Sequence, residues 1–279
     1  MAAPKGPAKR AAVEAGNGSR TGTVRIATWN VNSLTARMAR VEEWIEYARP
    51  DVLCMQETKV SDGAFPAMPF SALGYETVAH GDGRWNGVAI ASRLGISDVQ
   101  RGFDTDVDEQ GCRLLAATCG GIRVHSIYVP NGRAVDSEFY VAKLAWLEEL
   151  QRFVARHCKP SDAVVVAGDF NVAPEDRDVW DPAEVSGATH VTEPERKALR
   201  ALEDWGLVDG FRLLYDQDDL YSWWDYRAGN FHKHKGMRID LVLLSDPLAR
   251  SCRYALIDRN ARKGRQPSDH APLFVDVER

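Results

Sequence analysis

The chain has 279 residues, of which 44% are hydrophobic and 27% charged, and its formal net charge is −5. These ordinary fractions exclude a disordered, fibrous or low-complexity protein, and the length suffices for one large domain with a single core. Taken as a bulk quantity, the negative charge argues against a nucleic-acid partner, because a phosphate backbone attracts lysine and arginine.

The first residues are rich in Ala, Gly, Lys and Arg and contain no long apolar run. They lack the apolar core of a secretory signal, so a disordered basic tail is expected over 1–22, with an organellar transit peptide as the alternative. One folded domain is expected over 23–279. Its five cysteines form no C-x-x-C pair, and no apolar stretch reaches the ~18 residues of a membrane span. A cytoplasmic protein without a membrane partner is therefore expected.

From residue 23 onward, short apolar runs alternate with amphipathic segments. Strands are predicted, on β-branched content and length, over 24–29, 51–56, 87–92, 113–118, 122–129, 163–167, 239–244 and 271–277. Helices are predicted, from apolar residues spaced three or four apart, over 36–48, 137–156 and 193–205. Because the strands come in groups, the pattern favours two packed sheets with helices outside over one doubly wound parallel sheet.

Five of these strands border polar segments of similar composition. The segments are WNVN (29–32), QET (56–58), YVPNG (128–132), GDFN (168–171) and SDHAP (268–272). Any one of them could be a plain turn, since Asn and Asp bond their own backbone there. Together they supply acids, amides and one histidine at strand ends, where catalytic groups are commonly carried.

The composition of these segments indicates a hard metal. Magnesium and manganese take oxygen ligands, whereas zinc prefers Cys and His clusters, which the chain lacks. Metal-assisted hydrolysis of a phosphate ester is therefore the predicted chemistry. No phosphate-binding loop, dinucleotide fingerprint or nucleophile elbow is present. A glycosidase with two acids stays open, because the sequence fixes no carboxylate separation.

At this point the residues resemble the exonuclease III-type abasic-site endonucleases of the endonuclease/exonuclease/phosphatase superfamily, from about residue 25 to 278. The resemblance rests on RIATWNVNSLTAR (25–37), PDVLCMQETK (50–59), IYVPNG (127–132), GDFNVAP (168–174), WGLVDGFR (205–212), YSWWDYR (221–227), RIDLVLLS (238–245) and PSDHAP (267–272). It implies a DNase I-like four-layered α/β sandwich. In that fold two mixed sheets lie face to face between helices, and the active site lies at one end.

The resemblance also implies roles for individual residues. The metal set it implies, with Glu57 as the principal ligand, is Glu57, Asn30, Asp269, Asp169 and Asn171. The catalytic set it implies is Asp169, His270, Asp240, Tyr128 and Asn171. Asp169, with Asn171 beside it, would orient or deprotonate the attacking water, and His270 would pair with Asp240. Tyr128 and Asn131 would bond phosphate oxygens. The substrate-binding set is Asn131, Asn32, Arg37, Trp223, Met237, Ile239 and Arg238.

Three of these residues, Trp223, Met237 and Ile239, would line an apolar slot for a flipped-out sugar that has no base to unstack. One of Trp223 and Trp224 is expected to face the core and the other the site. Asn32 stands where some relatives carry an Asp, which leaves one-metal and two-metal catalysis both open.

The implied function is a DNA repair nuclease that uses Mg²⁺, with Mn²⁺ as a substitute. It would act as a monomer on duplex DNA with abasic sites or blocked 3′ ends, cutting 5′ to the abasic site and leaving a 3′-OH. Exonuclease activity in the 3′→5′ direction and 3′-phosphatase activity would accompany this cut. The rivals are a superfamily phosphoesterase acting on inositol phosphates or sphingolipids, and an inactive paralogue that only binds nucleic acid.

The distribution of charge removes the opening objection to nucleic acid. Residues 227–265 hold ten Lys/Arg against three Asp/Glu, whereas 169–195 hold eight acids and one Arg. The basic segment is expected to follow a DNA backbone, although a solvated face would look the same in sequence.

Overall fold

The structure is a computed structural model in which residues 22–108 and 111–279 are described. Apart from Gly22, the disordered tail expected over 1–22 lies outside the described residues.

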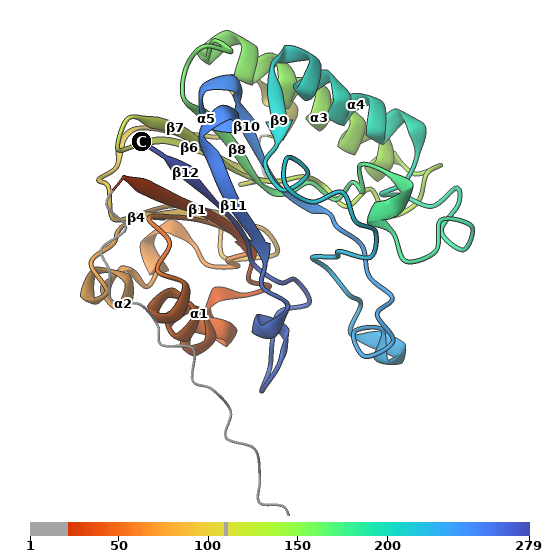
Figure 1. Cartoon of the computed structure of the whole chain (residues 1–279), viewed down its shortest axis with the longest axis horizontal. Helices are drawn as coiled ribbons and strands as arrows, with labels where there is room; N and C mark the ends of the chain where they lie inside the picture. The colour runs from red at the N-terminus through yellow and green to blue at the C-terminus, as the bar shows by residue number, and fades with distance from the viewer. Residues whose placement is uncertain (1–21, 109–110) are drawn as a thin grey trace, which may run out of the picture.

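Six strands of the described chain form a first sheet in the order β11-β12-β1-β2-β4-β3. Their bounds are β1 Thr23–Asn30, β2 Val52–Gln56, β3 Glu76–His80, β4 Val88–Ser92, β11 Cys252–Ile257 and β12 Leu273–Glu278. β1 and β2 run parallel, and every other neighbouring pair is antiparallel. The helices α1 (Leu34–Ala48) and α2 (Ala67–Ala72) lie on the outer side of this sheet (Figure 1).

The second sheet also has six described strands, in the order β5-β6-β7-β8-β10-β9. Their bounds are β5 Ser97–Arg101, β6 Leu114–Cys119, β7 Ile122–Tyr128, β8 Val164–Asp169, β9 Leu207–Asp209 and β10 Asp240–Ser245. Only β7 and β8 pair in parallel. The helices α3 (Glu138–His157) and α4 (Glu193–Trp205) cover its outer face, and α5 (Asp246–Ser251) leads from β10 to β11 in the first sheet.

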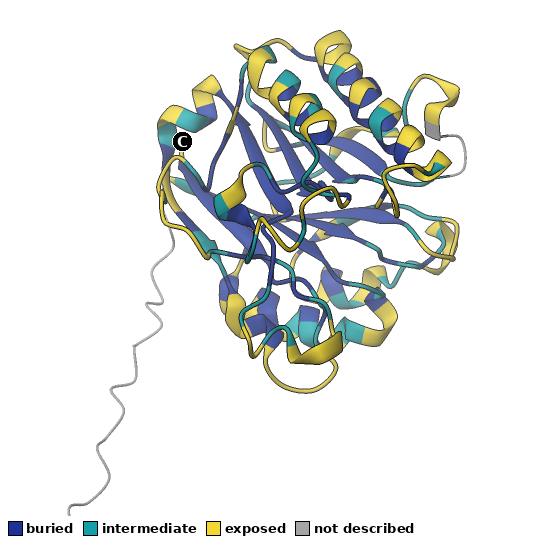
Figure 2. Ribbon diagram, turned by 90° about the vertical axis from the view of Figure 1, so that its right-hand side faces the viewer, coloured by how far each residue is buried: buried dark blue, intermediate teal, exposed yellow. Residues whose placement is uncertain are grey.

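Three apolar layers hold the four layers of backbone together. The central one packs the two sheets face to face, with Ile26 and Cys54 of the first sheet against Val124 and Val165 of the second. Two outer layers bury the inner faces of the helices against the sheets. Burial is accordingly concentrated in the strands, while the outward faces of the helices are exposed (Figure 2). The predicted four-layered α/β sandwich with two mixed sheets is confirmed.

Every predicted helix and strand is present, with ends shifted by a few residues. Helix α4 shows why its bounds were readable. Thr192 and Glu195 form a capping box at its start, and Gly206 follows its end with a φ of 122°, which favours glycine.

Four short strands and two short α-helices were not predicted, namely β3, β5, β9, β11, α2 and α5. β5 has the sequence SDVQR and is mostly exposed at a sheet edge, so it lacks the apolar run that identifies a strand.

No helix among the described residues is long and apolar enough to cross a membrane.

Candidate active site

The polar segments singled out in the sequence meet at one end of the sandwich. In the first sheet, the parallel pairing of β1 and β2 places Asn30 beside Gln56, directly before Glu57. In the second sheet, Asp169 pairs with Tyr128 of β7 on one side and with Asp240 of β10 on the other. Residues far apart in the chain thus converge because the strands that carry them end side by side.

Asn30 joins the two sheets at this end. Its fully buried amide Nδ2 donates to Glu57 Oε1 at 2.8 Å and to Asp169 Oδ2 at 3.0 Å. Its Oδ1 accepts the backbone N–H of Asn32 at 3.0 Å, which fixes the amide orientation. One neutral side chain therefore holds two carboxylates of opposite sheets next to each other.

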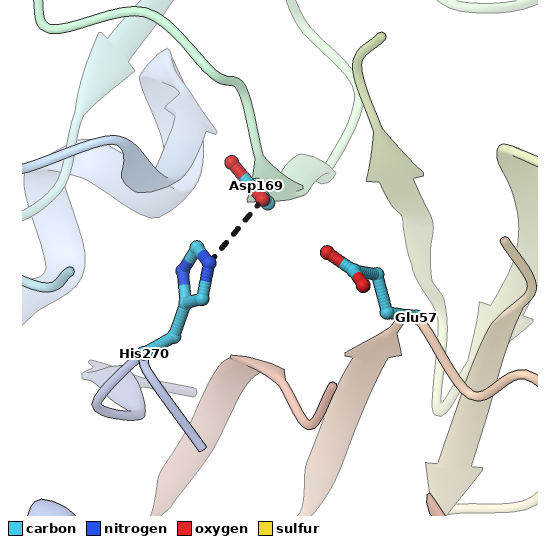
Figure 3. A group of neighbouring side chains, drawn as sticks. All are labelled: Glu57, Asp169 and His270. Carbon is cyan, nitrogen blue, oxygen red and sulfur yellow. Dashed lines mark ion pairs between the residues drawn. The ribbon is translucent and has the colours of Figure 1, made fainter. Parts of the chain in front are cut away.

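His270 faces the same carboxylate from the SDHAP turn. Ser268 anchors that turn, because its hydroxyl donates to Asn30 O at 2.7 Å and accepts the His270 N–H at 3.2 Å. His270 Nδ1 lies 2.8 Å from Asp240 Oδ2, and Nε2 lies 3.7 Å from Asp169 Oδ2. Figure 3 shows the imidazole directed at Asp169, with Glu57 on the other side of that aspartate.

Burial and charge give these two groups unusual acidities. Burial alone would lower the pKa of His270, but the carboxylates of Asp240 and Asp169 outweigh it and raise the pKa to about 10. Burial raises the pKa of Asp169 to about 7, against the opposing effect of His270. A cationic imidazole thus lies beside an aspartate that can take up a proton near neutral pH.

Asn171, Asn131 and Tyr128 surround Asp169. The Asn171 N–H donates to Asp169 Oδ1 at 2.9 Å, and Asn131 Nδ2 donates to Asn171 Oδ1 at 3.3 Å. Burial, together with the negative charges of Glu57 and Asp169, raises the pKa of the Tyr128 phenol. Tyr128 is therefore a proton donor at any physiological pH.

A second polar chain runs along the edge of the cluster. Asn32 Nδ2 donates to Asp269 Oδ1 at 3.0 Å, and Trp223 Nε1 donates to the other Asp269 oxygen at 3.2 Å. Lys59 donates to Asn32 Oδ1 at 2.7 Å and pairs with Glu57 Oε2 at 3.0 Å. Arg37 donates to the Asn32 carbonyl at 2.6 Å. Asn32, Arg37 and Asp269 are thus at the site, linked to one another.

One group of side chains offers the donors that a metal ion needs. Ligand atoms of Glu57, Asp169 and His270 all lie within 4.8 Å of one another. The two carboxylates of this group supply oxygen ligands that fit a hard divalent cation, whereas the cationic imidazole of His270 has no free nitrogen lone pair to offer. Asp269 and Asn171 lie beside this group, where Asp269 accepts hydrogen bonds from Asn32 and Trp223 and Asn171 Oδ1 accepts one from Asn131.

The residues expected to line an apolar slot come together beside His270. Met237 and Ile239 form a buried cluster with Ala173 and Val179, and Trp223 packs against it. The Trp223 backbone bridges both Met237 and His270, so the cluster adjoins the catalytic end. Trp224 is completely buried while Trp223 is half-buried. The expectation that the two tryptophans face different ways is confirmed.

Arg238 does not reach this surface. Its side chain is completely buried, and its guanidinium donates to Asp178 Oδ1 at 2.7 Å and to Asp209 Oδ2 at 2.6 Å. Because alternate residues of an extended chain face opposite sides, Arg238 points inward where Met237 and Ile239 border the site. The expected role of Arg238 in substrate contact is replaced by an internal ion-pair network.

The basic segment is likewise divided between the two ends of the molecule. Cys252 pairs with Val277 near the far end of β12, whereas the site lies before the first residue of that strand. Arg250 and Arg253 therefore lie at the end opposite to the site. Arg262 remains near the catalytic turn, where it donates to the Ser268 carbonyl. The idea of one continuous basic track over 227–265 is wrong.

Four residues at or behind the site were not singled out from the sequence, namely Lys59, His190, Lys143 and Glu195. Lys59 follows the QET motif directly, so its place could have been read from that motif. His190 lies half-buried with Nδ1 2.5 Å from Asn171 O and Nε2 3.5 Å from Asn131 Nδ2. It comes from the acidic segment 169–195, in a stretch that carries no motif. Lys143 and Glu195 lie on helices and carried no sequence signal of a buried role.

Comparisons with known proteins agree with this geometry. Residues 27–270 match the model of the "Endonuclease/Exonuclease/phosphatase family". The chain is 34% identical over 266 residues to the exodeoxyribonuclease III of Haemophilus influenzae, covering 91% of this chain and 99% of that one.

Solved structures show the same likeness. An AP endonuclease from Archaeoglobus fulgidus superimposes with a TM-score of 0.88 and 38% identity, covering 90% of this chain and 98% of that one. A 3′ phosphatase from Neisseria, bound to a product DNA hairpin, gives a TM-score of 0.88 and 35% identity, with 92% and 100% covered. The chain belongs to the endonuclease/exonuclease/phosphatase family.

Proposed function

We propose that this protein is a divalent-metal-dependent DNA repair nuclease. It hydrolyses the phosphodiester 5′ to an abasic site in duplex DNA, leaving a 3′-OH, and also removes nucleotides and phosphate from 3′ ends. The observation that carries the proposal is His270, held by Asp240, facing Asp169 beside Glu57. The names of the relatives, which include an exodeoxyribonuclease, an AP endonuclease and a 3′ phosphatase, supply the substrate class.

In this proposal Asp169 activates the attacking water. Its Oδ1 is held by the Asn171 N–H, which leaves Oδ2 towards Asn30 and His270. The carboxylate takes a proton from water as the water oxygen bonds to phosphorus. The bond from phosphorus to the O3′ of the preceding nucleotide then breaks, and O3′ leaves with the bonding electron pair and takes a proton from solvent to become the 3′-OH. A pKa of about 7 suits a general base near neutral pH.

The remaining polar groups would stabilise the charge that develops on the phosphate. His270 is cationic because its pKa is raised to about 10, and Asp240 fixes its tautomer through Nδ1. Tyr128 and Asn131 are neutral donors at the same end. Preorganised donors of this kind lower the barrier because they need no reorientation during the reaction.

Glu57 would be the principal ligand of Mg²⁺, or of Mn²⁺ in its place, with Asn30 holding the carboxylate. When bound, such an ion supplies Lewis-acid stabilisation of negative charge on the phosphate oxygens. At position 32 a neutral amide, rather than an acid that would hold a second ion, faces Asp269.

Selection of an abasic site would come from the apolar cluster next to His270. A sugar without a base can leave the helix at low unstacking cost and enter a slot formed by Trp223, Met237 and Ile239. The protein would act as a cytoplasmic monomer. The buried thiols of Cys54, Cys119 and Cys252 suit a reducing compartment.

The proposal is tested with two duplexes, one carrying a single abasic site and one ending in a 3′-phosphate. With MgCl₂, incision of the first and release of phosphate from the second are expected, and EDTA should abolish both. Cleavage of neither duplex, together with hydrolysis of an inositol phosphate, would assign the site to another phosphoester. Tight DNA binding without any hydrolysis would identify an inactive paralogue.

A further inference from the structure

Two charged side chains of the outer helices are completely enclosed. Lys143 of α3 and Glu195 of α4 have no exposed side-chain surface, and they form an ion pair with each other. Lysine and glutamate are almost never fully buried without a partner. The pair lies behind the loops that follow β7 and β8, which carry Asn131 and Asn171.

The Lys143 ammonium donates to the backbone of both loops. Its Nζ lies 2.6 Å from Asn171 O and 3.3 Å from Asn131 O, in addition to its contact with Glu195. It also lies 3.3 Å from Thr189 Oγ1. One cation thus holds the carbonyls of the two amide residues that surround Asp169.

Glu195 holds a third loop against the first two. One carboxylate oxygen accepts the His190 N–H and the Thr189 hydroxyl, both at 2.9 Å. The other accepts Thr192 N at 3.0 Å and Thr192 Oγ1 at 2.6 Å. The His190 ring is thereby directed at the Asn171 carbonyl, 2.5 Å from Nδ1.

The backbone around this pair is strained. Asn171 has a φ of 50° and His190 a φ of 82°, in the left-handed region that L-residues rarely adopt. Gly132 approaches the pair so closely that a Cβ there would lie 2.9 Å from Lys143 Cδ and 2.8 Å from Thr189 Oγ1. Conformations of this kind persist only where surrounding contacts hold them.

We infer that Lys143 and Glu195 are positioning residues of the nuclease site, which act through the Asn131 and Asn171 backbones to place Asp169. The inference rests on the proposed function. The Asn171 N–H that bonds Asp169 Oδ1 at 2.9 Å belongs to the residue whose carbonyl Lys143 holds. An apolar pair of the same volume can match or exceed a buried ion pair in stability, but it cannot donate to a carbonyl.

A pair of uncharged side chains that restores stability but cannot donate to the two carbonyls separates a positioning role from a structural one. Lys143→Met alone leaves Glu195 charged and unpaired, so it should destabilise the fold. The double variant Lys143→Met/Glu195→Gln removes both charges and should recover much of that stability. Its kcat on the abasic duplex should nevertheless stay about 10- to 100-fold below wild type, with KM changed less than about threefold, because small displacements at a reacting centre have effects of this size.

The matched control is an ion pair within α3, the helix that carries Lys143. Glu149 is buried and pairs with Arg156 at 2.7 Å, but neither residue contacts a loop of the site. Glu149→Gln/Arg156→Met should leave kcat within about twofold of wild type. Recovery of kcat together with stability in the Lys143→Met/Glu195→Gln variant would overturn the inference.

Hydrogen–deuterium exchange without DNA provides a readout that does not depend on the proposed function. In the double variant, backbone amides of 129–133, 169–173 and 187–192 should exchange at least about tenfold faster, while those of 146–156 in α3 stay protected. Unchanged exchange in all three loops would also overturn the inference. A wild-type protein that cuts no DNA, in which the variant still loosens these loops, would instead refute the proposed function alone. If the double variant does not fold, the isosteric Glu195→Gln is measured in the same two assays, with the same directions expected.

Discussion

Asp240 and Asp169 stand opposite each other on the antiparallel strands β10 and β8, and His270 lies between their carboxylates. The two acids differ in distance from the imidazole. Asp240 Oδ2 is 2.8 Å from Nδ1, whereas Asp169 Oδ2 is 3.7 Å from Nε2. Asp240 thus fixes the ring, whereas Asp169 Oδ2 lies beyond hydrogen-bond distance of Nε2, which in the proposed mechanism leaves it to the attacking water. One cross-strand register therefore places two aspartates at different distances from the same imidazole.

Replacing either Asp169 or His270 should remove turnover without unfolding the protein. Asp169→Asn loses the proton acceptor, and His270→Asn loses the cation beside the phosphate. Each should lower single-turnover incision of the abasic duplex by about 10³-fold or more. DNA affinity, measured by fluorescence anisotropy, should change little. A folded Asp169→Asn protein with near-normal turnover would remove this residue from the mechanism.

Trp223→Ala tests the apolar slot. Loss of the indole removes one wall beside Met237 and Ile239, so incision at an abasic site should fall about tenfold more than release of a 3′-phosphate. Trp223→Phe keeps an aromatic wall and serves as the control. Equal losses on the two substrates would contradict the slot.

Arg238 and Lys233 should behave in opposite ways although both lie in the basic segment. Arg238→Met leaves Asp178 and Asp209 partly unpaired in the interior, so the free energy of unfolding should drop by about 3–5 kcal/mol. The salt dependence of DNA binding should not change. Lys233 is exposed, so Lys233→Met should keep stability and reduce the salt slope by about one. A shallower slope for Arg238→Met would return Arg238 to the DNA surface.

Glu57→Gln should weaken metal binding more than any other single change at the site. It removes a charged oxygen ligand, and even an outer partner of a ligand is worth roughly 10–100-fold in affinity. Titration calorimetry with MnCl₂ in the absence of DNA measures this directly. Glu43→Gln, an exposed acid of α1, controls for the change in net charge. Unaltered Mn²⁺ affinity in Glu57→Gln would require another principal ligand.

His125 should make the fold sensitive to mild acid. It is completely buried in β7, and burial lowers its pKa to about 4. Its folded pKa is below the unfolded value of about 6.5, so the unfolded chain binds more protons between these values. The contribution of His125 to the free energy of unfolding is therefore fully present above about pH 6.5. It is lost as the pH falls towards 4, and the loss amounts to at most about 3 kcal/mol. Urea unfolding at several pH values should show a flatter dependence for His125→Gln, and parallel curves would refute this assignment.

The site residues that could be predicted from the sequence are those that lie inside a distinctive polar motif at the end of a strand. Glu57, Asp169 and His270 each end or begin a buried strand within a distinctive polar segment, so the segments alone located them. Arg238 was wrongly expected to contact substrate. Its side chain faces the interior because it pairs with Asp178, which lies sixty positions earlier in the chain, and the local sequence does not reveal so distant a partner.

Other features were invisible for a different reason. A lysine and a glutamate on amphipathic helices normally face water, so nothing marked Lys143 and Glu195 as enclosed. β5 and β3 depend on pairing with β6 and β4 rather than on their own composition. Such elements exist because of tertiary contacts, which no local pattern reports.

The Asn30 amide spans the junction of the two sheets, with Glu57 bonded from one sheet and Asp169 from the other. Neither sheet alone can supply the full set of groups, so cleavage becomes possible only after the two halves have docked. During refolding, catalytic competence should therefore appear as a late event, after backbone pairing within each sheet. The moment at which DNA cutting returns would time the closure of the sandwich itself.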